Sequence, residues 1–498
     1  MTVFIALLPI LCIFLFLFLF KLTSCRAGIL SFLVTILITL SYPRFQLAPE
    51  HILHSSSKGL LISLIAAYVL FFGIFLFHLM NSAGSIQSIA AFISQATSDR
   101  ILQVLMIIIG LSPLIESTSG FGIAFMIVVP IFIALGFSPM KSALLGLVSL
   151  LAVPWGALAT GTVIGAELGG LSLQKLGTGS AILSIPAFVY FTLVAVYIAG
   201  GIDAIKAKWN VLLLLSFTFS ISILFFNAFV SVELAGVLSS LLTTGMGIVL
   251  IKVSSFKNKR AELATSIESG NSILKVVSPY IILTGFIFIS RLWTPVRQFL
   301  ESHIVLSLPS FSFSMALLYS PGFWLFVTCL FTICIFKIQK AVVVLSLQKT
   351  LKQWIPFTIS TLAFVSISEV MATAGMTQLL SDTTGALLGT SFLLISPLIG
   401  GIGGYLTGSN TGSNAMFIQL QMQTAGQVGL SPELIAMSQN ASSSHSTMAC
   451  PSRVMLGASL CNVQTEENRL LKRITLIVLG AILIIGVSLL VFSLTLNE

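Results

Sequence analysis

The sequence T-G-S-N-T-G-S-N at residues 407–414 interrupts an apolar stretch, residues 383–432, that contains no charged side chain. A helix of about 20 apolar residues spans the hydrocarbon core of a bilayer. Backbone that is not helical within that core must be buried in protein or line a wet cavity. The short apolar runs on either side of 407–414 therefore predict a helical hairpin with a polar tip inside a membrane protein.

The composition of the whole chain supports this interpretation. Of its 498 residues, 56% are hydrophobic and only 8% are charged, whereas an average soluble domain has about 25% charged residues. The net charge of +9 does not indicate a nucleic-acid partner, because the Lys and Arg residues lie in short gaps between apolar runs and form no clustered basic face. Most fall on one side of the expected membrane. We predict an all-α polytopic (multi-pass) membrane protein, with the lipid bilayer as its surroundings.

A second polar interruption of an apolar run lies earlier in the chain and indicates an internal repeat. Three pairs of segments recur in the same order and at nearly the same separation. They are M-N-S-A-G (80–84) with M-A-T-A-G (371–375), S-T-S-G-F-G-I-A-F (117–125) with S-N-T-G-S-N-A-M-F (409–417), and G-F-S-P (136–139) with G-L-S-P (429–432). An odd number of expected helices separates the two copies, so they should have opposite orientations. This inverted-repeat architecture, with paired helical hairpins, is typical of secondary transporters.

The repeat divides the chain into four parts. They are 1–57, N-terminal transmembrane helices; 58–201, the first repeat with its hairpin tip at 116–122; 202–349, connecting transmembrane helices; and 350–498, the second repeat with its tip at 408–414. A further break follows each hairpin, at V-P-W-G-A (153–157) and at residues 440–451. These breaks predict discontinuous helices, whose ends would meet the tips near the middle of the membrane.

The hairpin tips are the candidate substrate site. Helix N-termini there would present N–H groups and a partial positive charge to an anion, and hydroxyl and amide side chains would complete its hydrogen bonds. The candidate substrate-binding residues are Ser117, Thr118, Ser119, Gly120, Ser409, Asn410, Thr411, Ser413, Asn414 and Arg453. Close helix packing is the alternative role for small residues in this region, and we assign it to Gly400 and Gly404.

Ionisable residues inside the expected spans are few and, because burying a charge there is costly, functional by default. Glu116 adjoins the first tip and is the first candidate for coupling protonation to transport. His445 is a second coupling candidate, since histidine titrates near neutral pH. A structural role is the alternative for His445 and for Glu369. Arg453 would pair with a carboxylate substrate, and a charge reaching to the cytoplasmic surface is its alternative.

Enzymatic motifs are absent from the sequence. It contains no H-E-x-x-H, G-x-S-x-G or Walker pattern, and its scattered cysteines do not have metal-ligand spacing. We therefore expect no enzyme activity, no cofactor and no metal.

The two tip regions, 116–125 and 406–421, resemble the signature regions of the bacterial L-lactate permease family. The first matches at Glu116, Gly120, Phe121 and Gly122, and the second at Leu406, Thr407, Gly408, Ser409, Asn410, Thr411, Ser413, Asn414, Met416 and Phe417. The resemblance implies uptake of L-lactate, often with D-lactate and glycolate, by proton symport through the inner (plasma) membrane of the cell. It also suggests kinship with carboxylate transporters, some of which use sodium and an elevator-like movement.

The sequence departs from the family pattern in two places. Residues 117–119, S-T-S, replace small apolar residues, and neither His445 nor Arg453 is typical of the second break. The expected function is secondary active import of lactate or a similar small 2-hydroxy monocarboxylate, such as glycolate, by proton symport. Sodium-coupled transport of another organic anion and a passive anion channel are the alternatives. The oligomeric state is open, and a homo-oligomer is one arrangement that the sequence allows.

Overall fold

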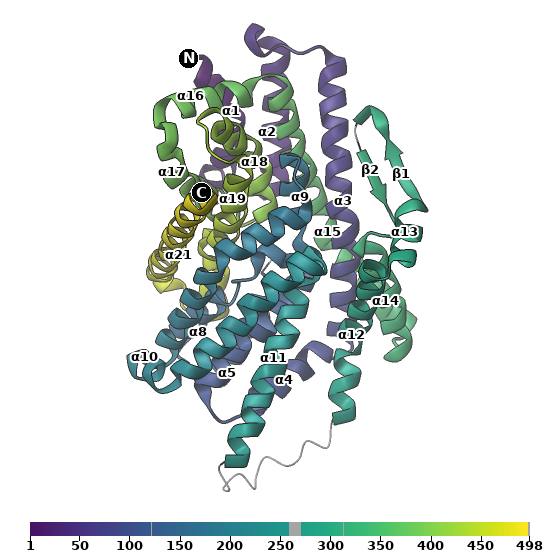
Figure 1. Ribbon diagram of the computed structural model, residues 1–498, viewed down its shortest axis with the longest axis vertical. Coiled ribbons are helices and arrows are strands. Elements are labelled where there is room, and N and C mark those ends of the chain that lie inside the picture. Colours follow the sequence, from purple (N-terminus) through teal and green to yellow (C-terminus); the bar gives the residue numbers. More distant parts are fainter. Residues whose placement is uncertain (121, 258–269, 312, 497–498) are drawn as a thin grey trace.

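A computed structural model describes residues 1–120, 122–257, 270–311 and 313–496. Nine helices in these residues are long and apolar enough to cross a membrane, and one further pair forms a bent span. The all-α polytopic fold is therefore confirmed (Figure 1).

The N-terminal part of the chain forms two helices followed by one long helix. They are α1 (Thr2–Phe14), α2 (Ser24–Ser41) and α3 (Pro49–Ser82). The first hairpin and the elements around it follow as α4 (Ser85–Gln95), α5 (Arg100–Met106), a π-helical turn (Ile107–Leu111), α6 (Ser112–Ser119) and α7 (Ile123–Ala134). Next come α8 (Pro139–Val148), α9 (Gly156–Gly169) and α10 (Leu173–Phe229). Helix α10 has 57 residues, and its backbone departs from helical geometry at Gly201 and Lys208.

The connecting region contains a small β-hairpin that the sequence analysis did not predict. The elements of this connecting region are α11 (Val232–Lys257), α12 (Gly270–Leu292), α13 (Thr294–Ser302), β1 (Val305–Leu308), β2 (Phe313–Ala316) and α14 (Pro321–Ile335). The strands pair antiparallel, with Val305 opposite Ala316. The strands carry no charged residue, so their composition does not distinguish them from the apolar helices. Phe311, Phe313 and Met315 alternate with smaller residues, and such alternation favours a strand over a helix.

The second half repeats the order of elements seen in the first. It consists of α15 (Lys340–Thr373), α16 (Met376–Leu388), α17 (Phe392–Thr407), α18 (Asn410–Gln427), α19 (Pro432–Ser446), α20 (Pro451–Leu460) and α21 (Glu467–Leu496). Long helices α3 and α15 thus open the two halves, and α17–α18 takes the place of the α5–α7 hairpin. Gly84 and Gly375 precede α4 and α16 at matching positions, and both have positive φ, 73° and 74°.

Discontinuous helices occur where the sequence predicts them. The axes of Pro139–Val148 and Val153–Gly169 differ by 56°. In the second half, α19 ends at Ser446, a short 3-10 turn follows at Thr447–Ala449, and α20 starts at Pro451. Proline at these starts lacks an N–H to donate to a preceding turn, so it interrupts a helix and begins the next one readily.

The helices α3 and α15 lie side by side and run antiparallel (Figure 1). Near the start of α3, the Ser55 hydroxyl lies 2.8 Å from the Thr373 hydroxyl at the end of α15. Near the end of α3, the Ser82 hydroxyl lies 3.4 Å from that of Ser346, near the start of α15. Helix α15 of this pair lines the site described next.

Candidate functional site

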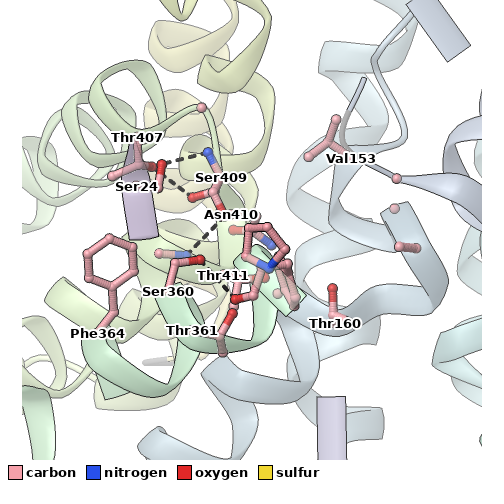
Figure 2. A pocket seen from close by; sticks show the side chains of 18 of the residues that line it. Ser24, Val153, Thr160, Ser360, Thr361, Phe364, Thr407, Ser409, Asn410 and Thr411 are labelled. Atoms are coloured by element: carbon pink, nitrogen blue, oxygen red, sulfur yellow. Dashed lines mark hydrogen bonds between the residues drawn. The ribbon is translucent and has the colours of Figure 1, made fainter. Parts of the chain in front are cut away.

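Both hairpin tips and both broken helices border one cavity of about 510 Å³. Figure 2 shows Thr407, Ser409, Asn410 and Thr411 of the second tip beside α15, with Val153 and Thr160 across the open space. Glu116 and Gly120 line it from the first hairpin, and Arg453 from α20. A volume of this size is typical of small-molecule sites.

The second tip presents a helix N-terminus to this cavity. Gly408 ends α17 with a φ of 63°, a left-handed conformation that favours glycine. The Ser409 hydroxyl accepts a hydrogen bond from the Gly412 amide at 3.2 Å, which caps α18. Asn410, Thr411 and Gly412, the first residues of this 18-residue helix, line the cavity. Their amides lie at the positive end of the helix dipole, where an anion is stabilised.

Arg453 brings a full positive charge to the same place. Its guanidinium donates to the Gly408 carbonyl at 3.0 Å and to the Thr447 hydroxyl at 3.1 Å. Gly122, at the first tip, also lies beside it, since a β-carbon there would be 3.6 Å from the Arg453 Nε. Arg453 therefore contacts the second tip, adjoins the first, and still lines the cavity.

Glu116 is buried at the first tip and bonds to its backbone. Its side chain is 1% exposed, and its Oε1 accepts a hydrogen bond from the Gly122 amide, just before α7, at 3.2 Å. The other oxygen, Oε2, has no hydrogen-bond partner among the residues that the structure describes, although Glu116 borders the cavity. A buried carboxyl oxygen without a partner is costly when ionised.

The serine and threonine residues of the first tip lie outside the cavity lining. Thr118 donates its hydroxyl to the Leu114 and Ile115 carbonyls, and Ser119 donates to Ile115 at 2.6 Å. Ser117 is buried beside Gly236 of α11. None of the three is among the residues that line the cavity, whereas Gly120 is. Phe121, which belongs to the family match, lies outside the described residues.

Asn440 of α19 joins the second tip to the first half of the chain. Its Oδ1 accepts from Asn410 at 2.9 Å and from Asn414 at 2.8 Å. Its amide nitrogen donates to Thr162 of α9 at 3.1 Å and to Ser180 of α10 at 2.9 Å. The amides of Asn410 and Asn414 therefore point toward a buried polar network, although Asn410 also borders the cavity.

The remaining candidates lie away from the cavity lining. Ser413 receives a hydrogen bond from Gln439 at 3.1 Å, and Asn414 also donates to the Gly161 carbonyl at 2.9 Å. His445 packs between the rings of Phe188 and Phe191, at centroid distances of 5.8 and 5.3 Å, and its Nε2 lies 3.1 Å from the Ser184 hydroxyl. Glu369 forms an ion pair with Lys58 at 2.8 Å.

Two segments line the cavity that the sequence analysis did not select. One is the start of α2, Thr23 to Cys25; the other is a face of α15 that includes Gln353, Ser360 and Thr361. The α15 residues recur at helical spacing and are polar within an apolar stretch, which is a usable signal. Nothing in the sequence near α2 gives an equivalent signal.

A strained turn supports the first tip. Ala157, Leu158 and Ala159 have φ of 38°, 56° and 62°, left-handed values that cost residues other than glycine roughly 1–2 kcal/mol each. Gly120 approaches this turn so closely that a β-carbon would lie 2.6 Å from that of Ala157. Strain of this kind persists where a site requires it.

The helices that could cross a membrane, nine of them in the described part of the chain, and the shared cavity define a multi-pass integral membrane protein of the transporter class, in the plasma membrane. A family model described as L-lactate permease matches residues 2–319 and 303–495. The chain therefore belongs to the L-lactate permease family.

Related proteins match this chain over most of its length and most of theirs. The chain is 24% identical to glycolate permease GlcA of Escherichia coli, over 94% of this chain and 91% of that protein. It is 23% identical to an L-lactate permease of Streptococcus iniae, over 86% and 92%, and 26% identical to a putative L-lactate permease of Haemophilus influenzae, over 89% and 91%. The solved structure of the Neisseria gonorrhoeae MtrF efflux pump covers 95% of each chain, with 12% identity and a TM-score of 0.48.

Proposed function

We propose that this protein is a secondary active transporter that imports lactate, or a similar small 2-hydroxy monocarboxylate such as glycolate, by proton symport. The observation that carries the proposal is the meeting of three groups at one cavity: the N-terminus of α18, the Arg453 guanidinium and the buried Glu116. The first two suit a carboxylate, and the third suits a proton. The names of the relatives, lactate and glycolate permeases, supply the substrate class.

The two halves, 58–201 and 350–498, are in this proposal inverted repeats that surround the site. The register that aligns residues 80–84 with 371–375 also aligns Ser82 with Thr373 and Ser55 with Ser346. The contacts Ser55–Thr373 and Ser82–Ser346 are then the same contact with its partners exchanged. A two-fold axis between antiparallel copies produces such exchanges.

Gradient-driven transport into liposomes tests the function directly. Purified protein should accumulate labelled lactate or glycolate when the compartment into which they move is alkaline. A sodium gradient without a pH gradient separates sodium-coupled transport from proton symport, and ion currents without accumulation would indicate a channel. Failure to accumulate any short hydroxy acid under the pH gradient would overturn the proposal.

Arg453→Gln should raise the lactate concentration that half-saturates exchange by about tenfold or more. A hydrogen bond to a charged group contributes about 1.5–3 kcal/mol, and Arg453 would lose its pair with the substrate as well as its bond to Gly408. The measurement is exchange of labelled for unlabelled lactate without a pH gradient. Arg469→Gln is the control, because Arg469 forms an exposed ion pair with Glu466. An unchanged half-saturating concentration in Arg453→Gln would place the carboxylate elsewhere.

A further inference from the structure

A hydrogen-bonded pair at the interface of α3 and α15 has no role in the function proposed above. The Nε2 of His78, on α3, lies 3.1 Å from the Oε1 of Gln353, on α15. The His78 side chain is buried, with 7% exposure, while Gln353 is partly exposed and lines the cavity. The pair thus connects a buried ring to the transport site.

The chemistry of the two groups fixes the direction of this hydrogen bond. An amide oxygen only accepts hydrogen bonds, so the His78 Nε2 must carry the proton and donate it. Because the Gln353 oxygen then accepts from His78, the amide group of Gln353 offers its two N–H bonds as donors. Gln353 itself lines the cavity.

The proposed substrate leaves a position for such a donor. Arg453 and the start of α18 suit its carboxylate, and Glu116 suits the coupled proton. The 2-hydroxyl, the group that distinguishes lactate from propionate, has no assigned partner among these residues. We propose that Gln353 donates a hydrogen bond to the 2-hydroxyl oxygen, that this bond selects hydroxy acids over plain carboxylic acids, and that His78 is the positioning residue that orients the Gln353 amide.

The charged surroundings of the pair support a positioning role for His78. Lys349, one turn before Gln353 on α15, has a repulsive electrostatic interaction with a charged His78 ring. In the register of the repeat, Lys349 corresponds to Lys58 and His78 to Glu369, which form an ion pair. The same place in the other half therefore holds two full charges, whereas here a ring faces a neutral amide that borders the cavity.

The test is competition in the full-length protein, reconstituted and assayed by exchange without a pH gradient. It measures the concentrations of L-lactate and of propionate that halve the uptake of labelled lactate. In Gln353→Leu, the value for lactate should rise about tenfold, as for the loss of one well-formed hydrogen bond, while the value for propionate stays unchanged. An equal rise for both acids, or a rise for neither, would overturn the inference.

His78 needs a separate readout, because a buried histidine also packs. His78→Leu should raise the lactate value selectively, and His78→Gln, which keeps an N–H donor, should restore part of the selectivity. The double variant with Gln353→Leu should show no loss beyond that of Gln353→Leu alone. Additive losses would contradict a shared role. Ser82→Ala is the matched control, since Ser82 makes a hydrogen bond across the same helix interface but lies outside the cavity lining.

This inference rests on the proposed function, and the two fail differently. Absence of lactate accumulation by the native protein under a pH gradient would refute the function. If the native protein transports lactate, but unlabelled lactate and propionate halve the uptake of labelled lactate at equal concentrations, only the role of Gln353 is refuted. If Gln353→Leu does not fold, Gln353→Asn, which shortens the reach of the amide, should give the same selective rise; equal values for the native protein and Gln353→Asn would overturn the inference.

Discussion

Glu116→Gln is expected to abolish pH-driven accumulation of lactate while lactate exchange continues. Glutamine has nearly the same shape and keeps an oxygen for the Gly122 amide, so the contact at the first tip survives. It cannot bind and release the proton that the carboxyl oxygen without a partner would carry. A gradient of one pH unit provides about 1.4 kcal/mol per proton, enough for about tenfold accumulation by one-to-one symport.

The measurement is the ratio of internal to external lactate at steady state. It should fall from about tenfold in the native protein to about one in Glu116→Gln under one pH unit. Glu433→Gln is the matched control, because Glu433 forms an exposed ion pair with Lys175 and does not border the cavity. Full accumulation by Glu116→Gln would show that another group couples the proton. Loss of exchange as well would show instead that Glu116 holds the first tip in shape.

Asn440→Leu should destabilise the protein and reduce lactate exchange by about tenfold. The amide of Asn410 would lose its acceptor, and a buried donor without a partner costs about 1–3 kcal/mol. Asn414, Thr162 and Ser180 each keep another partner, the carbonyls of Gly161, Pro154 and Met437. The main effect is therefore a second tip that is less firmly attached to α9 and α10.

Thermal unfolding in detergent, together with exchange in liposomes, checks this expectation. The melting temperature should fall by several degrees, as for a loss of about 1–3 kcal/mol. Asn81→Leu removes a comparable but exposed hydrogen bond, between Asn81 and Gln87, and should change neither measurement. Normal exchange by Asn440→Leu would mean that the network is only a packing feature.

The spans and breaks were predictable because they depend on local sequence. Apolar runs identify the helices, and the polar segment at 407–414 and the prolines at 154 and 451 identify the interruptions. The directions of side chains at the first tip were not predictable. Serine and threonine in a helix readily return their hydroxyls to the carbonyl three or four residues earlier, as Thr118 and Ser119 do, and no local pattern distinguishes that from a hydroxyl directed at a ligand.

Contacts between distant segments set the rest of the site. His445 is a polar residue in an apolar run, but its ring packs against Phe188 and Phe191, more than two hundred residues earlier in the numbering. The walls from α2 and α15 likewise follow from how helices assemble. Gln353 and Cys25 border the cavity because of helix packing that the sequence alone does not specify.

The contacts of Arg453 have a consequence for biosynthesis. A chain is synthesised from its N-terminus, so Glu116 and the start of α18 are made before α20. The guanidinium that contacts Gly408 and adjoins Gly122 arrives only with α20. Until then the nascent chain has both hairpins but not the cation beside them, and the cavity gains its full lining only with one of the last helices.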